Sequence, residues 1–166
     1  MTSLKSAVAA AVLGTAAIFT SSTAQAGQAC SYPPHVAQVA ELVGQGINAQ
    51  RRAAGLRPLQ QHESLRNAAF AHACDMAQMG RMTHTGSNGS NVMQRARAHG
   101  LTTCTIAENT AWGRPYEQPN DLVRGWMNSS GHRHNILMDR GVTYFGMGVA
   151  YNGNTPYFSW VVARAC

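Results

Sequence analysis

Apolar residues recur at helical spacing in two long stretches of the chain. Between residues 35 and 54 they fall three or four positions apart, as on one face of an amphipathic helix, and Gly55 follows as a stop signal. The apolar positions are Val36, Val39, Ala40, Val43 and Ile47. A second helix is predicted over residues 63–79, ended by Gly80, with alanines that suit close packing against a neighbouring layer. Its expected buried side consists of Leu65, Ala68, Ala69, Ala71, His72, Met76 and Met79.

Shorter elements follow. A polar, glycine-rich loop over residues 81–91 ends at Ser90, which is a suitable N-cap for a short helix over residues 91–99. Residues 104–112 contain the threonine, isoleucine and tryptophan typical of a strand. Another helix is predicted from Pro119 to Trp126, because apolar residues again recur at helical spacing.

The C-terminal region predicts a β-hairpin. Two strand-like runs, residues 144–151 and 155–163, flank an Asn-Gly-Asn turn. Gly146 and Gly148 weaken the first strand intrinsically and suit close approach by a helix or a ligand. Helices followed by a strand, another helix and a terminal hairpin indicate an α+β protein rather than repeated βαβ units.

The first 26 residues have the pattern of a cleaved signal peptide. Lys5 supplies a positive start, residues 7–18 are apolar, and Ala24-Gln25-Ala26 is a small-x-small cleavage site. A retained membrane anchor is the alternative, but the apolar run is too short for a span and no later run reaches the roughly 18 residues needed. We therefore expect a single exported domain over residues 27–166.

Charge adds little to this interpretation. Lys5 is the only lysine, so cleavage leaves 12 arginines against 7 acidic residues and a formal charge of +5 instead of +6. The arginines are scattered, with Arg51-Arg52 the only adjacent pair. Such a balance favours anionic polymers at a cell surface. No interleaving of basic and aromatic residues indicates a nucleic-acid partner.

Four cysteines lie in the expected mature chain: Cys30, Cys74, Cys104 and Cys166. An even number in an exported protein indicates two disulfides, with three possible pairings. Since the ends of compact domains often lie close together, we favour Cys30–Cys166 and Cys74–Cys104. A zinc–cysteine site or redox catalysis is less well supported, because the chain has no Cys-x-x-Cys pair.

The segment of residues 125–137 reads Gly-Trp-Met-Asn-Ser-Ser-Gly-His-Arg-His-Asn-Ile-Leu. Its Ser-Ser-Gly run predicts that the preceding helix ends and that a turn carries His132 and His134. An imidazole beside a helix end is held rigidly and is free to face a ligand. The alternative is that both histidines only satisfy backbone groups around the turn.

Three motifs resemble the CAP superfamily, also called SCP-like, which includes cysteine-rich secretory proteins, antigen 5 and plant pathogenesis-related proteins. Residues 126–137 resemble the bacterial signature Trp-Met-x-Ser-x-Gly-His-Arg-x-Asn-Ile-Leu. Residues 107–111 resemble Gly-Glu-Asn-x-Ala, with Ala107 where glycine is usual, and residues 75–84 resemble Asp-Met-Ala followed by Ser-His. With its flanking elements, the resemblance covers about residues 35–164.

The resemblance implies a three-layer α-β-α sandwich with a central antiparallel sheet. It also implies that His84 and His132 bind a divalent cation, with zinc the expected metal, beside the carboxylate of Glu108. These residues are 24 positions apart each time, so only folding brings them together. The carboxylate either binds the metal or orients the imidazoles.

One position departs from the eukaryotic pattern. Eukaryotic members usually place a second glutamate three residues after the helix tryptophan, where this chain has Ser129. Acid–base catalysis by a carboxylate pair is therefore less expected. Asn109 and Asn135 are expected to bond backbone groups.

The resulting hypothesis is a secreted binding module, extracellular or periplasmic, with a lipid, glycan or protein ligand. We expect a monomer, with no nucleic-acid partner and no membrane span. The alternative is a zinc-dependent hydrolase acting on peptide or cell-wall substrates, since zinc with an open position activates water. A third possibility is a metal that only stabilises the fold.

Overall fold

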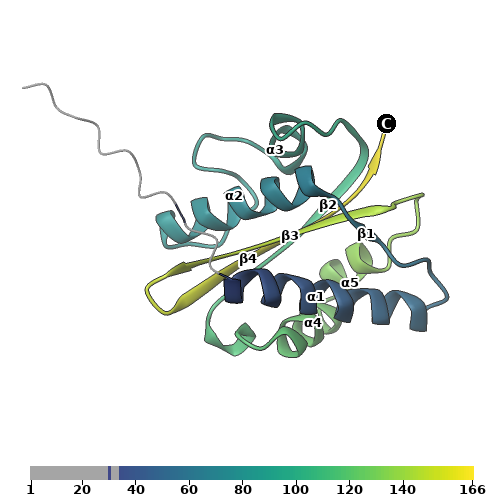
Figure 1. Cartoon of the computed structure of the whole chain (residues 1–166), viewed down its shortest axis with the longest axis horizontal. Helices are drawn as coiled ribbons and strands as arrows, with labels where there is room; N and C mark the ends of the chain where they lie inside the picture. The colour runs from purple at the N-terminus through teal and green to yellow at the C-terminus, as the bar shows by residue number, and fades with distance from the viewer. Residues whose placement is uncertain (1–29, 31–33) are drawn as a thin grey trace, which may run out of the picture.

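A four-stranded sheet forms the middle layer of the protein (Figure 1). The computed structural model describes residue 30 and residues 34–166, so the predicted signal peptide lies outside the described residues. Helices α2 and α3 cover one face of the sheet, and α1, α4 and α5 cover the other. The elements in chain order are α1 (Pro34–Ala53), β1 (Gln60–Gln61), α2 (Glu63–Met79), α3 (Val92–Ala98), β2 (Thr103–Trp112), the 3-10 helix η1 (Arg114–Tyr116), α4 (Pro119–Asn128), α5 (Ser130–Ile136), β3 (Tyr144–Asn152) and β4 (Thr155–Ala165). The predicted three-layer α+β architecture is confirmed.

The sheet is mixed rather than purely antiparallel. Its order is β1-β3-β4-β2, and the three long strands are antiparallel, with β3 and β4 forming the predicted hairpin. The two-residue strand β1 pairs parallel with β3. It arises where the linker after α1 runs along β3, as the N–H of Gln60 donates to Thr143 O and that of His62 to Phe145 O. A strand this short carries no periodic signal in the sequence.

Large side chains fill the space between the sheet and α1, α4 and α5. Alternate residues of β3 and β4 point to this side, as expected for strands with both faces covered. Trp126 of α4 and Trp160 of β4 are fully buried here, with ring centroids 6.4 Å apart. The predicted apolar face of α1 packs into the same core.

The other side of the sheet is packed more closely, because glycines replace side chains. A Cβ atom added to Gly146 would lie 2.1 Å from Leu65 C, and one added to Gly148 would lie 2.2 Å from Phe70 N. The backbone of α2 therefore rests directly on β3, as the two glycines predicted. Within α2, Ala73 and Ala77 are buried instead of the expected Ala71 and Met79.

Helix ends follow the predictions with two corrections. Gly80 ends α2 in the left-handed conformation at φ 64°. The N-cap of α3 is Asn91 rather than Ser90, because Asn91 and Gln94 form a reciprocal capping box. After α4, Ser129 is extended (φ −98°, ψ 122°), but its carbonyl then accepts from Arg133 and a new helix, α5, begins. His132 therefore lies on a helix rather than in a turn.

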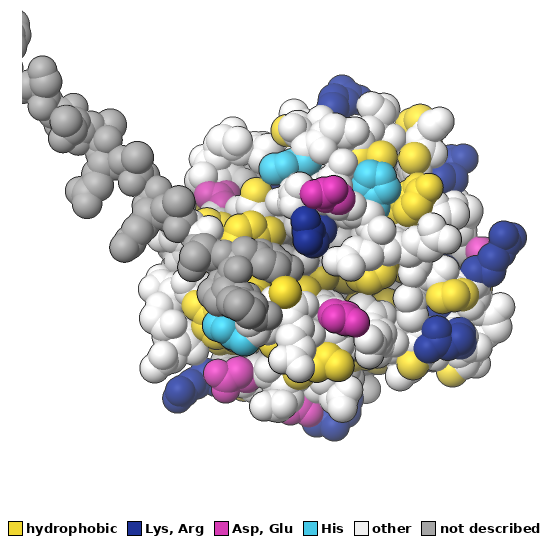
Figure 2. Space-filling model, in the orientation of Figure 1, with side chains coloured by type: hydrophobic (Ala, Val, Ile, Leu, Met, Phe, Trp, Pro, Cys, Tyr) yellow, Lys and Arg dark blue, Asp and Glu magenta, His cyan; other side chains and the backbone are white. Residues whose placement is uncertain are grey.

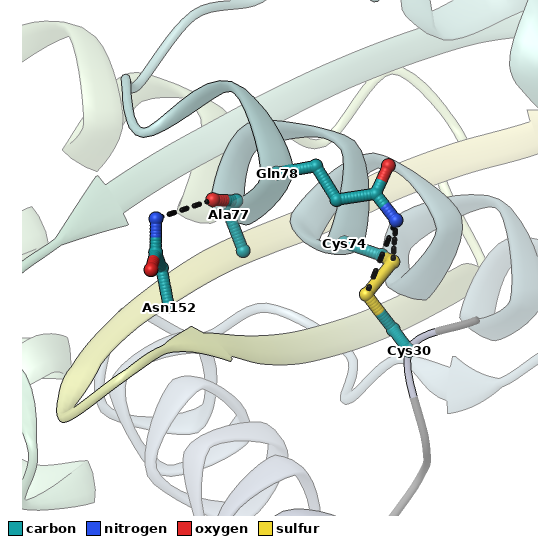
Figure 3. The surroundings of a disulfide bond; sticks show 5 residues. All are labelled: Cys30, Cys74, Ala77, Gln78 and Asn152. Carbon is teal, nitrogen blue, oxygen red and sulfur yellow. Dashed lines mark hydrogen bonds between the residues drawn. A yellow bond between two sulfur atoms is a disulfide. The ribbon is translucent and has the colours of Figure 1, made fainter. Parts of the chain in front are cut away.

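The predicted disulfide pairing is wrong. Cys30 pairs with Cys74 of α2, and Cys104 pairs with Cys166, with Cα–Cα distances of 5.9 Å and 5.0 Å. Because β4 runs antiparallel to β2, the chain end reaches the start of β2, where the N–H of Cys166 donates to Thr102 O. Figure 3 shows the other bridge, against which the Gln78 amide lies, 3.6 Å from the Cys74 sulfur.

Charged side chains do not gather into one patch on the face shown in Figure 2, where arginines and acidic residues are intermingled. This agrees with the scattered arginines of the sequence. Across residues 34–166, no helix is both long and apolar enough to cross a lipid bilayer.

The contact between α2 and β3 gives a first prediction. Replacing Gly148 by alanine would place a methyl group against the backbone of α2 and push α2 away from β3. The free energy of unfolding should therefore fall by about 1–3 kcal/mol or more in urea denaturation. Gly131→Ala is the matched control, because a Cβ there meets nothing within 4 Å. Alanine in that helix should be neutral or stabilising by up to about 1 kcal/mol. Equal stability of the two variants would contradict the packing described.

Candidate functional site

The carboxylate of Glu108 is the centre of the site. It projects from β2 toward α2 and α3, and its side chain is only 3% exposed. Arg95 Nη2 of α3 donates to both of its oxygens at 2.9 and 3.0 Å. Ser159 Oγ of β4 donates to Oε1 at 2.9 Å, and His84 Nδ1 lies 3.0 Å from Oε2. A buried charge is tolerated only when it is paired and hydrogen-bonded in this way.

The surroundings of Glu108 favour its ionised form. Burial by itself raises the pKa of a carboxyl group, because charge is disfavoured in a low-dielectric interior. The hydrogen bond from His84 and the charge of Arg95 outweigh burial, so the pKa of Glu108 lies below its ordinary value. Since an ionised carboxylate only accepts hydrogen bonds, His84 Nδ1 carries the proton between them.

His84 is held from one side and exposed on the other. Its hydrogen bond to Glu108 raises its pKa, and its side chain is 60% exposed. Arg95 Nη1 fixes the loop that carries it, donating to His84 O at 3.2 Å and to Ser90 O at 2.8 Å. In the neutral imidazole the proton on Nδ1 leaves the Nε2 lone pair free, pointing away from the carboxylate.

His132 lies on α5, and its backbone is bonded to β2. Asn109, next to Glu108 on β2, donates from Nδ2 to His132 O at 3.0 Å. Asn135 donates to Asn109 Oδ1 at 2.9 Å and to Glu108 O at 3.3 Å. The predicted backbone-bonding role of both asparagines is confirmed, and the network ties α5 to the strand that carries Glu108.

The pKa of His132 is lowered by two effects. Burial lowers the pKa of His132, and the positive charge of His84 lowers it further. His132 is therefore biased toward its neutral form, which is the form that binds metal ions. The structure places His84 against Glu108, and Asn109, the next residue of β2, bonds the backbone of His132.

Arg51, which sequence reasoning did not single out as part of the site, supports the C-terminal end of α5. Its guanidinium is buried and donates to Ile136 O and Met138 O, both at 2.8 Å, and to Arg57 O at 2.9 Å. The bond to Ile136 O satisfies a carbonyl that the end of α5 leaves unpaired, and the other two bonds satisfy loop carbonyls. Desolvation lowers the pKa of Arg51, opposed by the charge of Asp139.

Three further residues around Glu108 also carried no specific signal. Arg95 belongs to a seven-residue helix, and Ser159 is one of several small residues of β4. His72, expected to be structural, is buried; its Nε2 donates to Thr83 O at 2.8 Å and lies 3.8 Å from Glu108 Oε2. Burial lowers the pKa of His72 despite the nearby carboxylate.

The metal-binding potential of the site rests on two imidazoles. Within the described part of the chain, no group of three or more histidine, cysteine or acidic side chains is arranged to hold a metal ion. Glu108 faces Arg95 and Ser159, so its geometry fits the orienting role rather than direct coordination. A cation held here would have His84 and His132 as its protein ligands and water in its other positions.

Comparison with known sequences gives a family. A sequence model of the cysteine-rich secretory protein family, CAP, matches residues 45–163. The Bacillus subtilis protein YkwD is 33% identical over 124 residues, which cover 75% of this chain and 47% of YkwD. The matched region thus spans about half of YkwD.

Solved structures share the fold. An outer surface protein from Borrelia burgdorferi has a TM-score of 0.69 at 20% identity, covering 76% of this chain and 92% of that one. An extracellular protein containing an SCP domain from Bacillus anthracis has a TM-score of 0.68 at 20% identity, covering 81% of this chain and 44% of that one. At this level of identity the two similarities concern the fold alone.

The Arg95–Glu108 pair gives a second prediction. Arg95→Leu removes two hydrogen bonds from a buried carboxylate, so the free energy of unfolding at neutral pH should fall by about 3–5 kcal/mol. The loss should shrink at low pH, where Glu108 is protonated in the variant. Arg124→Leu, which removes an exposed ion pair with Asp121, should cost under about 1 kcal/mol. Equal losses from the two variants would show that the buried pair contributes no more to stability than the exposed pair.

The histidines give a third prediction, on pH. His84 should titrate above the ordinary value of about 6.5 and His132 below it, as measured by NMR on the metal-free protein. The folded-state pKa of His84 is raised, so its contribution to stability is complete below its unfolded-state pKa. The contribution is lost as pH rises through its folded-state pKa. The folded-state pKa of Glu108 is lowered, so its contribution to stability is present above its unfolded-state pKa. That contribution is lost as pH falls through the folded-state pKa. The reverse order of the two histidines would contradict the hydrogen bond to Glu108.

Proposed function

The chain belongs to the cysteine-rich secretory protein family, CAP, and we propose that it acts outside the cytoplasm as a binding module with a zinc site at His84 and His132. Two disulfides support export, because such bonds persist in oxidising compartments. The outer-surface and extracellular descriptions of the similar structures point the same way. A lipid, glycan or protein is the ligand class proposed for the module.

The observation that carries the zinc proposal is the saturated carboxylate of Glu108. Carboxylate–histidine–metal arrangements fix the tautomer of the imidazole and raise its basicity as a ligand. Glu108 holds His84 in the required tautomer, and Arg95 and Ser159 hold Glu108. His132 adds a second imidazole that favours the neutral form.

The same observation favours binding over hydrolysis. A general base works best with a pKa near the operating pH and within reach of the proton it takes. Glu108 has a lowered pKa, is buried, and has both oxygens engaged by Arg95. Its role is better described as support for His84 than as proton acceptor for a water molecule.

The fourth prediction concerns zinc. The purified mature protein should bind zinc in isothermal titration calorimetry, and His84→Ala and His132→Ala should each weaken binding by at least about 10-fold. His134→Ala is the matched control, since His134 is an exposed residue of the same helix. Zinc affinity that all three variants leave unchanged would refute the site.

A parallel assay separates binding from turnover. Wild type and His132→Ala are incubated with peptide and cell-wall substrates, with zinc or a chelator. Zinc binding without turnover supports the module. Hydrolysis that requires zinc and disappears in His132→Ala would establish the hydrolase instead. Zinc that raises thermal stability but supports no turnover, and that changes the binding of no lipid, glycan or protein tested, would leave the metal a structural role.

A further inference from the structure

A polar hollow is lined in part by Arg95 and His72, which both also face Glu108. It is bordered by α2, α3 and the loop between them and has a volume of about 250 Å³. Ala71 and Ala98 are its only apolar lining residues within the described chain, and eight polar side chains make up the rest. The glycine-rich loop of residues 81–91 supplies part of this lining.

Each of three lining side chains is held by a hydrogen bond to one of its polar atoms and has a second polar atom that is not bonded in the described structure. Asp75 Oδ2 accepts from Ser87 N at 2.7 Å, Asn88 Oδ1 from Ser90 N at 3.0 Å, and Gln94 Oε1 from Asn91 N at 2.9 Å. Backbone N–H groups donate, so the bonded atoms must be oxygens and the amide orientations are determined. For the residues described, Asp75 Oδ1, Asn88 Nδ2 and Gln94 Nε2 have no hydrogen-bond partner. The hollow therefore presents one strong acceptor and two donors in held positions.

His72 is the most deeply buried of the lining residues, at 1% exposed. It lines the hollow, its side chain is fully buried, and its Nε2 is committed to Thr83 O. Its Nδ1 is buried and unpaired in the described structure. Buried polar atoms are rarely left unpaired, and with Nε2 protonated the neutral ring has an acceptor at Nδ1.

The lining favours one ligand chemistry. An anion would meet the carboxylate of Asp75, while the guanidinium of Arg95 is committed to Glu108 and two carbonyls. Calcium prefers six to eight oxygen ligands, and the hollow has one carboxylate beside an arginine. A lipid would contact only two apolar side chains, those of Ala71 and Ala98. A hydroxyl group both donates and accepts, so a ring with several hydroxyls matches an acceptor flanked by donors.

We propose that this hollow is a second binding site, which takes one unit of a neutral sugar. Its volume is below the roughly 300–1,000 Å³ of sites for drug-sized ligands and suits a single ring. Asp75 accepts from a sugar hydroxyl, and Asn88 and Gln94 donate to its neighbours. The site needs no metal and does not use His84 or His132, so it stands or falls separately from the zinc proposal.

The fifth prediction is tested by NMR titration of the full mature protein with glucose, galactose, mannose and N-acetylglucosamine, each alone. At least one should give saturable shifts at the amides of Asp75, Ser87–Ser90 and Gln94, with a dissociation constant of about 1 mM, as expected for about a dozen non-hydrogen atoms. Gln94→Glu keeps the oxygen that caps Asn91 and turns the free donor into an acceptor, so affinity should fall about tenfold or more. Asp75→Asn keeps an oxygen for Ser87 and turns the free acceptor into a donor, with the same expected loss.

Gln50→Glu is the matched control, because it makes the same chemical change on the exposed face of α1 and should leave sugar binding unchanged. The spectra without sugar show whether each variant is folded. No shift with any of the four sugars overturns the proposal, as does equal binding by wild type and Gln94→Glu. Shifts at the same amides with inorganic phosphate or calcium alone, and none with sugars, would also overturn it. Zinc affinity measured on the same samples should not change in Gln94→Glu.

Discussion

The buried ion pair between Glu108 and Arg95 is the interaction on which the site depends. A carboxylate this well removed from water is tolerated because Arg95 donates to both oxygens and Ser159 and His84 complete its shell. Each donor comes from a different element: α3, β4 and the loop after α2. The need to pair one charge thus fixes the position of the short helix, of the loop and of His84 together.

Amides perform the corresponding task on the opposite side of β2. Asn109 bonds His132 O of α5 to the strand, Asn135 bonds the last turn of α5 to it, and Arg51 bonds the carbonyls at the helix end. A helix of seven residues has little stability of its own, because helix nucleation is unfavourable and few bonds follow it. His132 is therefore placed by polar contacts to neighbouring elements. The cost of leaving those buried groups unpaired is what makes the arrangement specific.

The sequence predicts the parts of this structure that local rules determine. Residues 63–79 form a helix as expected because apolar periodicity and Gly80 agree, and Gly146 and Gly148 marked the surface where α2 rests on β3. The disulfide pairing failed because it depends on the register of β4 against β2, which nothing local encodes. Arg95 was missed for the same reason, since an arginine in a short helix is ordinarily exposed and only the fold gives it a buried partner. His84, Glu108 and His132 were found through family motifs, and chain spacing alone would not have connected them.

The two proposed sites share a wall, and the rigidity of that wall argues against coupling between them. Arg95 and His72 face Glu108 and also line the polar hollow. A ligand shifts another site only if it binds two arrangements of the intervening residues with different affinity. Arg95 donates four hydrogen bonds, to Glu108 and to two loop carbonyls, and moving it would leave a buried carboxylate without its charged partner. A second arrangement of that side chain is therefore high in free energy. The same ion pair that builds the site should keep the sugar hollow and the imidazole pair independent of each other.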